Sequence, residues 1–295
     1  MATVFGIPLA VLFGQVLIGL INGAFYAILS LGLAVIFGLL NIINFAHGAL
    51  YMAGAFTAWI LLNHAGIGFW GALVLAPLIV GLAGVVIERL LLSRIYRLDH
   101  LYGLLLTFGL ALMITGLFRV GFGSSGLPYP APAELSGGTN LGFMFLPNYR
   151  GFVVAASILV CLGTWFVIER TRIGAYLRAA TEDPDLVQTF GINVPLLITL
   201  TYAAGVALAA FAGVLAAPIY SVNPGMGQDL IIVVFAVVVI GSMGSIAGAV
   251  VTGFALGVVE GLAKVAWPEA SSTVIFVIMA VVLLLKPQGL FGKVS

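Results

Sequence analysis

Long apolar runs separated by short polar segments extend along the whole chain. Most of these runs approach the roughly 20 residues that an α-helix needs to cross the apolar core of a bilayer. The pattern therefore predicts an all-α polytopic membrane protein, with about 8 to 10 transmembrane or re-entrant helices in one domain over residues 1–295. The runs cover residues 9–40, 49–62, 69–88, 101–120, 151–168, 196–219, 229–260 and 271–285.

Two of the runs are too long for one span. As a single helix, residues 9–40 would extend about 48 Å, whereas the hydrocarbon core is about 30 Å thick. We therefore expect a helix break there, at Gly23 or in the stretch from Ser30 to Gly32. Residues 229–260 contain the sequence GSMGSIAGA, from Gly241 to Ala249, and these small residues predict a turn between two short membrane segments.

The positions of lysine and arginine predict the orientation, because cytoplasmic loops of membrane proteins are enriched in both residues. If the runs alternate across the membrane, one side receives most of the basic residues and is then cytoplasmic. Ten segments with both chain termini inside satisfy this parity, whereas eight segments require two short pieces to be re-entrant. The cytoplasmic clusters are Arg89, Arg94 and Arg97, then Arg170, Arg172 and Arg178, then Lys286 and Lys293, while Arg119, Arg150 and Lys264 lie outside.

The largest outside segment is residues 121–150. It is rich in Gly, Pro and Ser, and it is too polar and too often interrupted to form a span. We expect an extracytoplasmic loop with many turns, which serves either as a plain connector or as a docking surface for an outside partner.

Composition narrows the class of protein further. Hydrophobic residues make up 62% of the chain and charged residues 7%, whereas soluble domains carry about 25% charged residues. The formal net charge of +1 argues against a nucleic-acid partner. The one cysteine, Cys161, can form no internal disulfide, and its apolar surroundings predict a small buried hydrophobic residue.

A charged loop at residues 169–195 interrupts the apolar pattern. It holds seven charged residues, and burying them in lipid would cost about 20 kcal/mol, so the loop must lie in water. Asp183 is expected to cap a short helix that begins at Pro184 and is stopped by Gly191. Three apolar residues, Leu186, Val187 and Phe190, are expected on one face of that helix. Such a patch either folds back on the membrane domain or docks a separate subunit.

Three polar residues, Asn41, Asn44 and His47, recur every third position within an otherwise apolar region. This spacing places them along one helical face or around a helix break. Buried amide and imidazole groups in lipid need partners, so they either tie helices together or line a polar path. The residues alone favour the packing role.

The sequence lacks the patterns of three kinds of functional site: a charge at the centre of a span, a metal site and a phosphate-binding loop. No predicted span has a well-placed central charge, which proton-coupled or ion-coupled carriers usually need. Glu260 and Lys264, four residues apart, are expected to form an ion pair near the outer interface. The histidines are scattered, so no metal-ligand spacing exists, and the terminal GLFGKVS lacks the spacing of a phosphate-binding loop. We therefore expect no cofactor in this chain and no ATP hydrolysis by it.

Three stretches of the sequence, taken together and in order, resemble the LivH-type permease of branched-chain amino acid ABC importers. These stretches are NIINFAHGALYMAGAF, RAATEDPDLVQTFGINVPLLITLTYAAGVALAAFAGVLAAP and GSMGSIAGA. The resemblance implies a multi-pass subunit of the bacterial inner membrane that pairs with a second, LivM-like permease. It also implies two cytoplasmic ATPase subunits that use ATP and Mg, and an extracytoplasmic binding protein that delivers Leu, Ile or Val.

The resemblance also implies roles for individual residues. In permeases of ABC importers, a cytoplasmic helix pair that ends in a glycine docks on the ATPase, and residues 178–191 match that region. The general pattern E-A-A-x-x-x-G is poorly kept, because other residues occupy its first three places. The residues assigned to ATPase coupling are Arg178, Asp185, Leu186, Val187, Phe190 and Gly191, and those assigned to the substrate path are Asn41, Asn44 and His47.

Two other functions remain open from the sequence. A permease of the same class for urea, amides or a broader set of amino acids would share these features. A stand-alone channel or secondary carrier for small neutral solutes would not need a glycine-ended docking helix, and a carrier would usually carry charge within the membrane.

Overall fold

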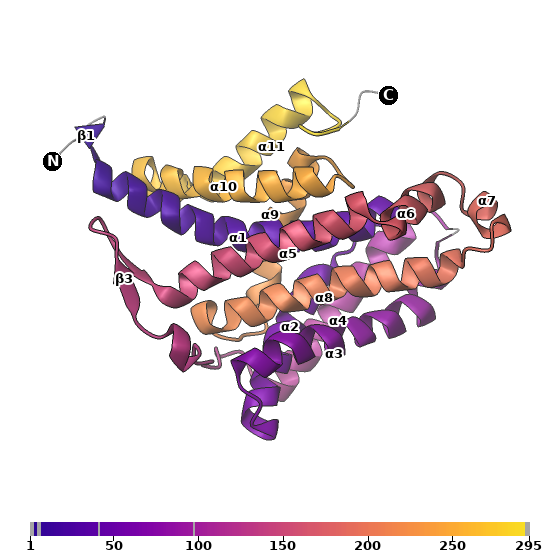
Figure 1. Cartoon of the computed structure of the whole chain (residues 1–295), viewed down its shortest axis with the longest axis horizontal. Coiled ribbons are helices and arrows are strands. Elements are labelled where there is room, and N and C mark those ends of the chain that lie inside the picture. Colours follow the sequence, from indigo (N-terminus) through magenta and orange to yellow (C-terminus); the bar gives the residue numbers. More distant parts are fainter. Residues whose placement is uncertain (1–2, 5–6, 41, 97, 293–295) are drawn as a thin grey trace.

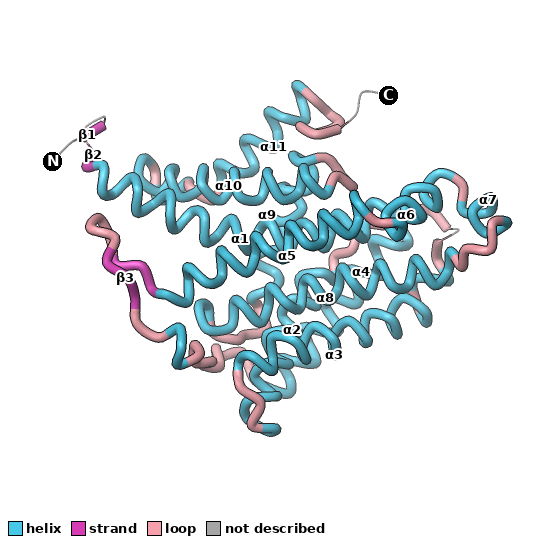
Figure 2. The backbone as a smooth tube through the Cα atoms, in the orientation of Figure 1, coloured by secondary structure: helices cyan, strands magenta, loops and turns pink. Residues whose placement is uncertain are grey.

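The computed structural model describes residues 3–4, 7–40, 42–96 and 98–292, and nearly all of its ordered elements are helices (Figure 1 and Figure 2). Of the residues singled out above, Asn41, Arg97 and Lys293 lie outside the described residues. The helices are α1 (Leu9–Leu40), α2 (Ala46–Ala65), α3 (Phe69–Leu90), α4 (His100–Phe122), α5 (Asn148–Arg170), α6 (Arg172–Glu182), α7 (Pro184–Thr189), α8 (Val194–Tyr220), α9 (Met226–Gly241), α10 (Ile246–Ala266) and α11 (Thr273–Leu285). Short 3-10 helices are η1 (Leu92–Arg94), η2 (Ala133–Leu135) and η3 (Pro268–Ala270), and two small hairpins pair β1 (Thr3–Val4) with β2 (Ile7–Pro8) and β3 (Gly138–Asn140) with β4 (Phe145–Pro147).

Six of the described helices, α1, α3, α4, α5, α8 and α10, are long and apolar enough to cross a membrane, and α9 and α11 are shorter apolar helices. On α3, the exposed residues Val74, Leu78 and Leu82 recur every four positions and so form one apolar face. A face of this kind is unfavourable in water and favourable against lipid chains. The helices therefore confirm the predicted class, an all-α polytopic membrane protein.

The predicted break in residues 9–40 is wrong, because α1 is one continuous helix. Every residue from 23 to 36 is buried, so this part of α1 is surrounded by protein and lipid thickness does not limit its length. Ser30 does not interrupt the helix, since its hydroxyl donates a hydrogen bond to the carbonyl of Tyr26 within the same helix. A consequence is that α1 begins at the end of the molecule opposite α7 (Figure 1), so the expectation of both termini on one side is wrong for this helix.

Gly23 serves close packing of α1 against α10. A Cβ on Gly23 would lie 2.9 Å from the Cα of Phe254, and a Cβ on Gly257 would collide with the backbone of Gly23 itself. Glycines that let two helix backbones touch are a common packing device inside membranes. The two helices run antiparallel, since Gly38 near the end of α1 lies against Gly244 just before α10.

The bundle has two distinct ends (Figure 1). One end, here called the α7 end, carries α6, α7 and the start of α8. The described basic residues of the three predicted clusters lie toward it: Arg89 is beside Glu88, which contacts Thr199 near the start of α8, and the segment after Lys286 returns through a hydrogen bond from Leu290 to Ile240. This placement agrees with the grouping that the sequence predicts.

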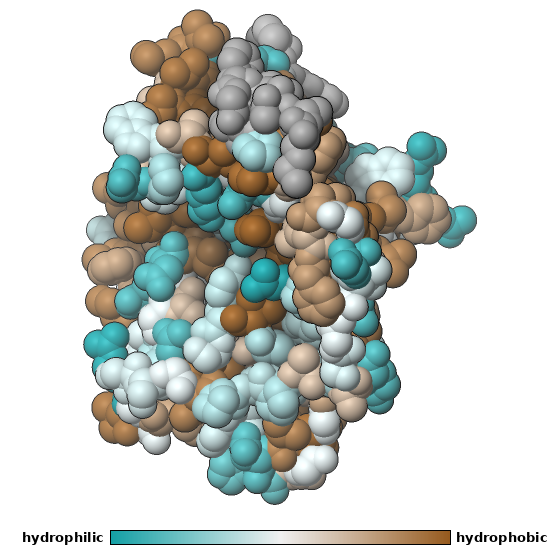
Figure 3. All heavy atoms as spheres, turned by 90° about the vertical axis from the view of Figure 1, so that its left-hand side faces the viewer, coloured by the Kyte–Doolittle hydropathy of each residue, from teal (hydrophilic) through white to brown (hydrophobic). Residues whose placement is uncertain are grey.

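The opposite end, here called the β3 end, carries the segment between α4 and α5. This segment contains η2 and the β3–β4 hairpin, and Leu127 pairs with Val222 through two backbone hydrogen bonds of 2.8 and 2.9 Å. Tyr129 is buried within the segment, and burial raises the pKa of its hydroxyl to about 12. Viewed from this end, hydrophilic side chains are scattered among apolar ones (Figure 3).

The predicted turn in residues 229–260 is present and shorter than expected. Helix α9 ends at Gly241 and α10 begins at Ile246, so the last residues of the predicted turn belong to α10. Ser242 has a φ of 87° and Gly244 a φ of 87°, and the Ser245 hydroxyl caps α10 by accepting a hydrogen bond of 3.1 Å from the Gly248 amide.

Candidate functional site

A cavity of about 360 Å³ opens among α1, α2, α9 and the end of α8. Its lining combines polar groups with apolar side chains, the usual make-up of a small-molecule site. The polar lining residues are Asn22, Tyr26, Tyr51, Tyr220, Asn223 and Asp229, and the apolar ones are Phe25, Met226 and Leu230.

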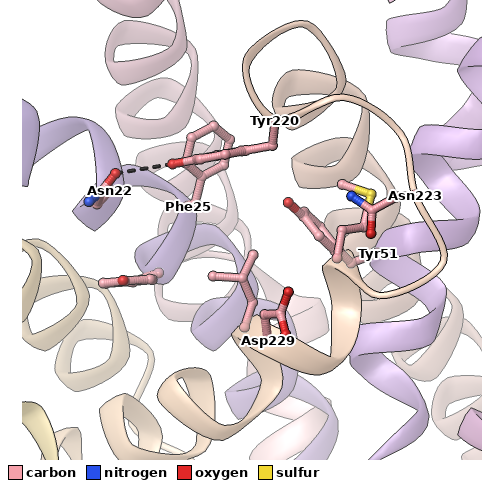
Figure 4. A pocket seen from close by; sticks show the side chains of 9 residues that line it. Asn22, Phe25, Tyr51, Tyr220, Asn223 and Asp229 are labelled. Carbon is pink, nitrogen blue, oxygen red and sulfur yellow. Dashed lines mark hydrogen bonds between the residues drawn. The ribbon is translucent and has the colours of Figure 1, made fainter. Parts of the chain in front are cut away.

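The polar side chains of the cavity come from elements that are distant in sequence (Figure 4). On one side, the hydroxyl of Tyr220 donates a hydrogen bond of 3.1 Å to the Oδ1 of Asn22. On the other side, the hydroxyl of Tyr51 and the carboxylate of Asp229 point into the same space. The cavity thus presents donors, acceptors and one negative charge around its walls.

Close helix contacts fix the position of α2 in this arrangement. A Cβ on Gly213 of α8 would collide with the carbonyl of Tyr51, and a Cβ on Gly48 would lie 2.5 Å from the carbonyl of Gly227. Both neighbours of α2 therefore approach its backbone directly. Tyr51 is held between them, and its side chain is 1% exposed.

Two of the predicted path residues, Asn44 and His47, lie one to two turns before Tyr51 and are fully buried. The Nδ2 of Asn44 donates to the hydroxyl of Tyr202 over 3.3 Å, and its Oδ1 accepts from the Ala46 amide over 3.1 Å. The Nε2 of His47 lies 3.0 Å from the carbonyl of Leu29, so it is the protonated nitrogen. These bonds join the start of α2 to α8 and α1, while a role for Asn44 and His47 in a substrate path remains a prediction.

The charged loop folds as two helices, α6 and α7. The buried face of α6 consists of Gly174, Leu177 and Ala180. A Cβ on Gly174 would collide with the carbonyl of Ile168, so only glycine allows α6 to turn back so closely on α5. Arg178 secures this turn, because its Nη1 donates a hydrogen bond of 2.9 Å to the same Ile168 carbonyl, one of the free carbonyls at the end of α5.

The second helix of the loop begins at Pro184, as the sequence predicts, and ends at Thr189, two residues before Gly191. The Oδ1 of Asp183 accepts a hydrogen bond of 2.9 Å from the Leu186 amide, and Pro184 occupies the first helical position. The chain leaves α7 through Gly191, which has a φ of 81°. Asp185 is exposed in the first turn of α7, where a negative charge is favourable.

The predicted apolar patch on α7 is correct for two residues and wrong for the third. Leu186 is 53% exposed and Phe190 is 77% exposed. Val187 is buried and packs with Ala180 and Val194, so it joins α7 to α6 and α8. In a helix of only six residues, spacings of three and four do not determine which residues face the rest of the protein. Packing against α6 and α8 buries Val187 and leaves Leu186 and Phe190 exposed.

Two carboxylates in the helices are buried. Glu88 near the end of α3 is 2% exposed and accepts hydrogen bonds of 2.7 Å from both Thr199 and Tyr96. Glu260 on α10 pairs with Lys264 at 2.8 Å, as predicted, and also accepts a hydrogen bond of 2.6 Å from Tyr26. Each carboxylate is therefore neutralised or satisfied by local partners.

We compared the sequence with models of known protein families to find the class of protein to which this cavity and this loop belong. The model of the family described as "Branched-chain amino acid transport system / permease component" matches residues 15–283. The chain belongs to this permease family. The match covers the cavity, the α6–α7 loop and the turn before α10, so these three features are parts of one permease.

Curated relatives extend over the same length. The permease is 31% identical to BraD, the high-affinity branched-chain amino acid transport system permease protein of Pseudomonas aeruginosa, over 95% of both chains. It is 29% identical to the LivH permease protein of Escherichia coli K12, again over 95% of both chains. A LivM permease protein of Salmonella typhimurium is 29% identical over 90% of this chain and 67% of its own.

The cavity residues of this permease were not among the sites predicted from the sequence. Asn22 is a polar residue inside an otherwise apolar run, and Asp229 is a charged residue at the start of another, and these positions were the available signal. Tyr51 gave no signal, because a tyrosine among alanines and methionine on a helix is usually part of a packed core.

Proposed function

We propose that this permease is the membrane-spanning subunit of an ATP-driven importer of branched-chain amino acids. The observation that carries the proposal is end-to-end similarity to BraD and LivH, whose names specify branched-chain amino acid transport. Leu, Ile and Val combine a zwitterion with an apolar side chain. A cavity with amide, hydroxyl and carboxylate groups beside Phe25, Met226 and Leu230 suits that combination.

The proposed complex contains subunits in addition to this chain. The similarity to both LivH and LivM proteins supports pairing with a second permease of the LivM kind. Two cytoplasmic ATPase subunits would bind ATP and Mg, and an extracytoplasmic binding protein would deliver the substrate. The complex would lie in the bacterial inner membrane, with the α7 end in the cytoplasm and residues 121–150 outside.

The α6–α7 loop is proposed to dock on the ATPase subunits and to transmit their ATP-driven movement to the membrane helices. Leu186 and Phe190 are exposed on α7, and two large apolar residues in water favour contact with another protein. Val187 is buried against α6 and α8, so a force on α7 passes to both helices. Leu177 of α6 in turn borders the same small hollow as Ala34 and Val35 of α1, which continues the contact to the centre of the bundle.

The substrate path is proposed to pass through the cavity. Asn44 and His47 are then residues that position the first half of α2, including Tyr51, against α1 and α8. The segment 121–150 holds the cavity-lining turn in place through the pairing of Leu127 with Val222. A binding protein docked on that segment would therefore contact an element connected to the cavity wall.

Co-purification tests the assembly directly. The chain is expressed with and without neighbouring ATPase and permease genes, purified from membranes, and assayed for ATPase activity with binding proteins loaded with leucine or urea. A stable complex that leucine-loaded protein stimulates is the expected result. Stimulation by the urea-loaded protein alone would assign the permease to urea or amides, and solute transport by the isolated chain would indicate a channel or carrier.

A further inference from the structure

We propose that Asp229 binds the ammonium group of the transported solute in the cavity, and that it makes this site selective for amino acids over neutral amides. The inference rests on the proposed function and specifies the chemistry of its transport site. Four features of the cavity support it: a carboxylate that forms no ion pair among the described residues, a set of free donors, an apolar wall and a rigid surrounding structure.

Among the described residues that line the cavity, Asp229 is the one with a charged side chain. In the described part of the chain, the ion pairs join Arg89 to Glu88, Arg178 to Glu169 and Lys264 to Glu260, and Asp229 takes part in none of them. Asp229 lies in the first turn of α9 and is exposed, so its carboxylate is accessible to a ligand in the cavity. An unpaired carboxylate that points into a cavity is a site for a cation, and a primary ammonium group both neutralises it and donates hydrogen bonds.

The remaining polar groups fit a carboxylate ligand. Tyr51 is 1% exposed, and within the described residues its hydroxyl has no hydrogen-bond partner, although it points into the cavity (Figure 4). Asn22 and Asn223 use their side-chain oxygens to accept hydrogen bonds from Tyr220 and the Gly225 amide. Their amide NH₂ groups are therefore left as donors, which is the chemistry that a carboxylate group requires.

An apolar wall completes the site. Phe25 is almost fully buried, and Met226 and Leu230 are the cavity-facing residues on either side of Asp229 along α9. A branched aliphatic side chain would bury apolar surface here, whereas a urea molecule would bury none. The three groups of one amino acid would thus each have a partner in the cavity: Asp229 for the ammonium group, the free donors for the carboxylate, and the apolar residues for the aliphatic side chain.

The two elements that carry the polar residues of the site, the turn before α9 and the start of α9, are both held by close backbone contacts. The turn that carries Asn223 is paired with the outer segment through Leu127 and Val222, and the start of α9 touches α2 where Gly48 meets Gly227. A fixed charge in a fixed cavity discriminates between ligands better than one on a mobile loop, because the wrong ligand leaves it unpaired.

A labelling experiment on the complete importer tests the inference. Leu230→Cys adds a thiol to the cavity wall, while the native Cys161 is buried and is expected to be unreactive in the parent importer. Labelling by N-ethylmaleimide is measured against increasing leucine, 3-methylbutylamine or 4-methylpentanoate. Leucine and the amine are expected to slow labelling, and the acid, which lacks the ammonium group, is expected not to.

The charge is then removed by Asp229→Asn, with Glu269→Gln as the matched control. Glu269 is an exposed carboxylate in η3 that does not line the cavity. In the Asp229→Asn importer, the concentration of leucine or amine that halves labelling should rise by about tenfold or more, while the control is unchanged. Met226→Cys serves as a second thiol position on the apolar wall should Leu230→Cys not assemble.

The outcomes separate this inference from the proposed function. Equal protection by the acid and the amine, or undiminished protection in Asp229→Asn, overturns the role of Asp229. Normal ATP-dependent leucine uptake by the parent importer without any protection overturns the assignment of the cavity. Absence of leucine uptake by the parent importer would instead contradict the proposed function.

Discussion

The hydroxyl of Thr199, five residues into α8, donates a hydrogen bond of 2.7 Å to the buried carboxylate of Glu88 on α3. Tyr96 donates a second bond of 2.7 Å to the same carboxylate. Burial, and then this hydrogen bond, raises the pKa of Tyr96, so its hydroxyl stays protonated and remains a donor. The carboxylate therefore joins α3 to the helix that follows the charged loop.

Loss of this carboxylate should destabilise the α7 end. Glu88→Ala leaves both hydroxyls without their charged acceptor and should lower the free energy of unfolding by about 2 to 3 kcal/mol. The buried Cys161 makes a convenient probe, since a thiol-reactive dye labels it only on unfolding. Glu169→Ala removes a half-exposed carboxylate and should cost about 0.5 kcal/mol. Equal effects of the two substitutions would contradict the structural role of Glu88.

Replacing a glycine by alanine should have opposite effects on stability in the contact between α1 and α10 and on the open face of α4. Gly257→Ala forces the two backbones apart at Gly23 and should destabilise the protein by about 1 to 3 kcal/mol. Gly116→Ala on α4 places its methyl group in open space and should stabilise by about 0.5 to 1 kcal/mol, because alanine is the better helix residue. The same thermal unfolding assay measures both, and a mild effect at Gly257 would mean that the helices are not in close contact.

The two faces of α7 predict different consequences for the same substitution. Replacing Leu186 and Phe190 by Asp should abolish ATPase association while the permease remains folded, since both side chains are exposed. Val187→Asp should lower the thermal stability of the permease itself, since the charge would be buried between α6 and α8. Co-purification and thermal unfolding are measured on both proteins. An intact complex with the double variant would show that α7 is not the docking helix.

Asn44 offers a test of the substrate path. Asn44→Leu removes the hydrogen bonds to Tyr202 and Ala46, and we expect reduced uptake with unchanged complex assembly, because α2 and its Tyr51 lose a constraint. A matched control is Asn63→Leu: the exposed Asn63 side chain donates a hydrogen bond to the Trp59 carbonyl of its own helix and, among the described residues, to no other helix. Normal uptake by the Asn44 variant would limit this residue to packing.

The sequence was most informative where one local rule decides the structure. Asp183, Pro184 and Gly191 set the start and end of α7 because capping, the fixed φ of proline and the positive φ of glycine act within a few residues. The long apolar runs predicted the membrane helices for the same reason, since each span satisfies its own backbone.

Long-range contact explains where the sequence misled. A glycine at a helix break and a glycine at a close helix crossing look identical in one sequence, and only α10 shows that Gly23 is the second kind. Val187 and Leu186 are adjacent apolar residues, and contact with α6 decides which is buried. The cavity was invisible because Asn22, Tyr51 and Asp229 come together only when α1, α2 and α9 pack.

Leucine uptake into proteoliposomes is the most direct test of the central claim, that this chain is the permease of an ATP-driven importer. The chain is reconstituted alone or with its ATPase and permease partners, with leucine-loaded binding protein on one side and ATP on the other. The account predicts uptake only with all partners and ATP present. Leucine uptake by the chain alone, unchanged by ATP, would contradict it.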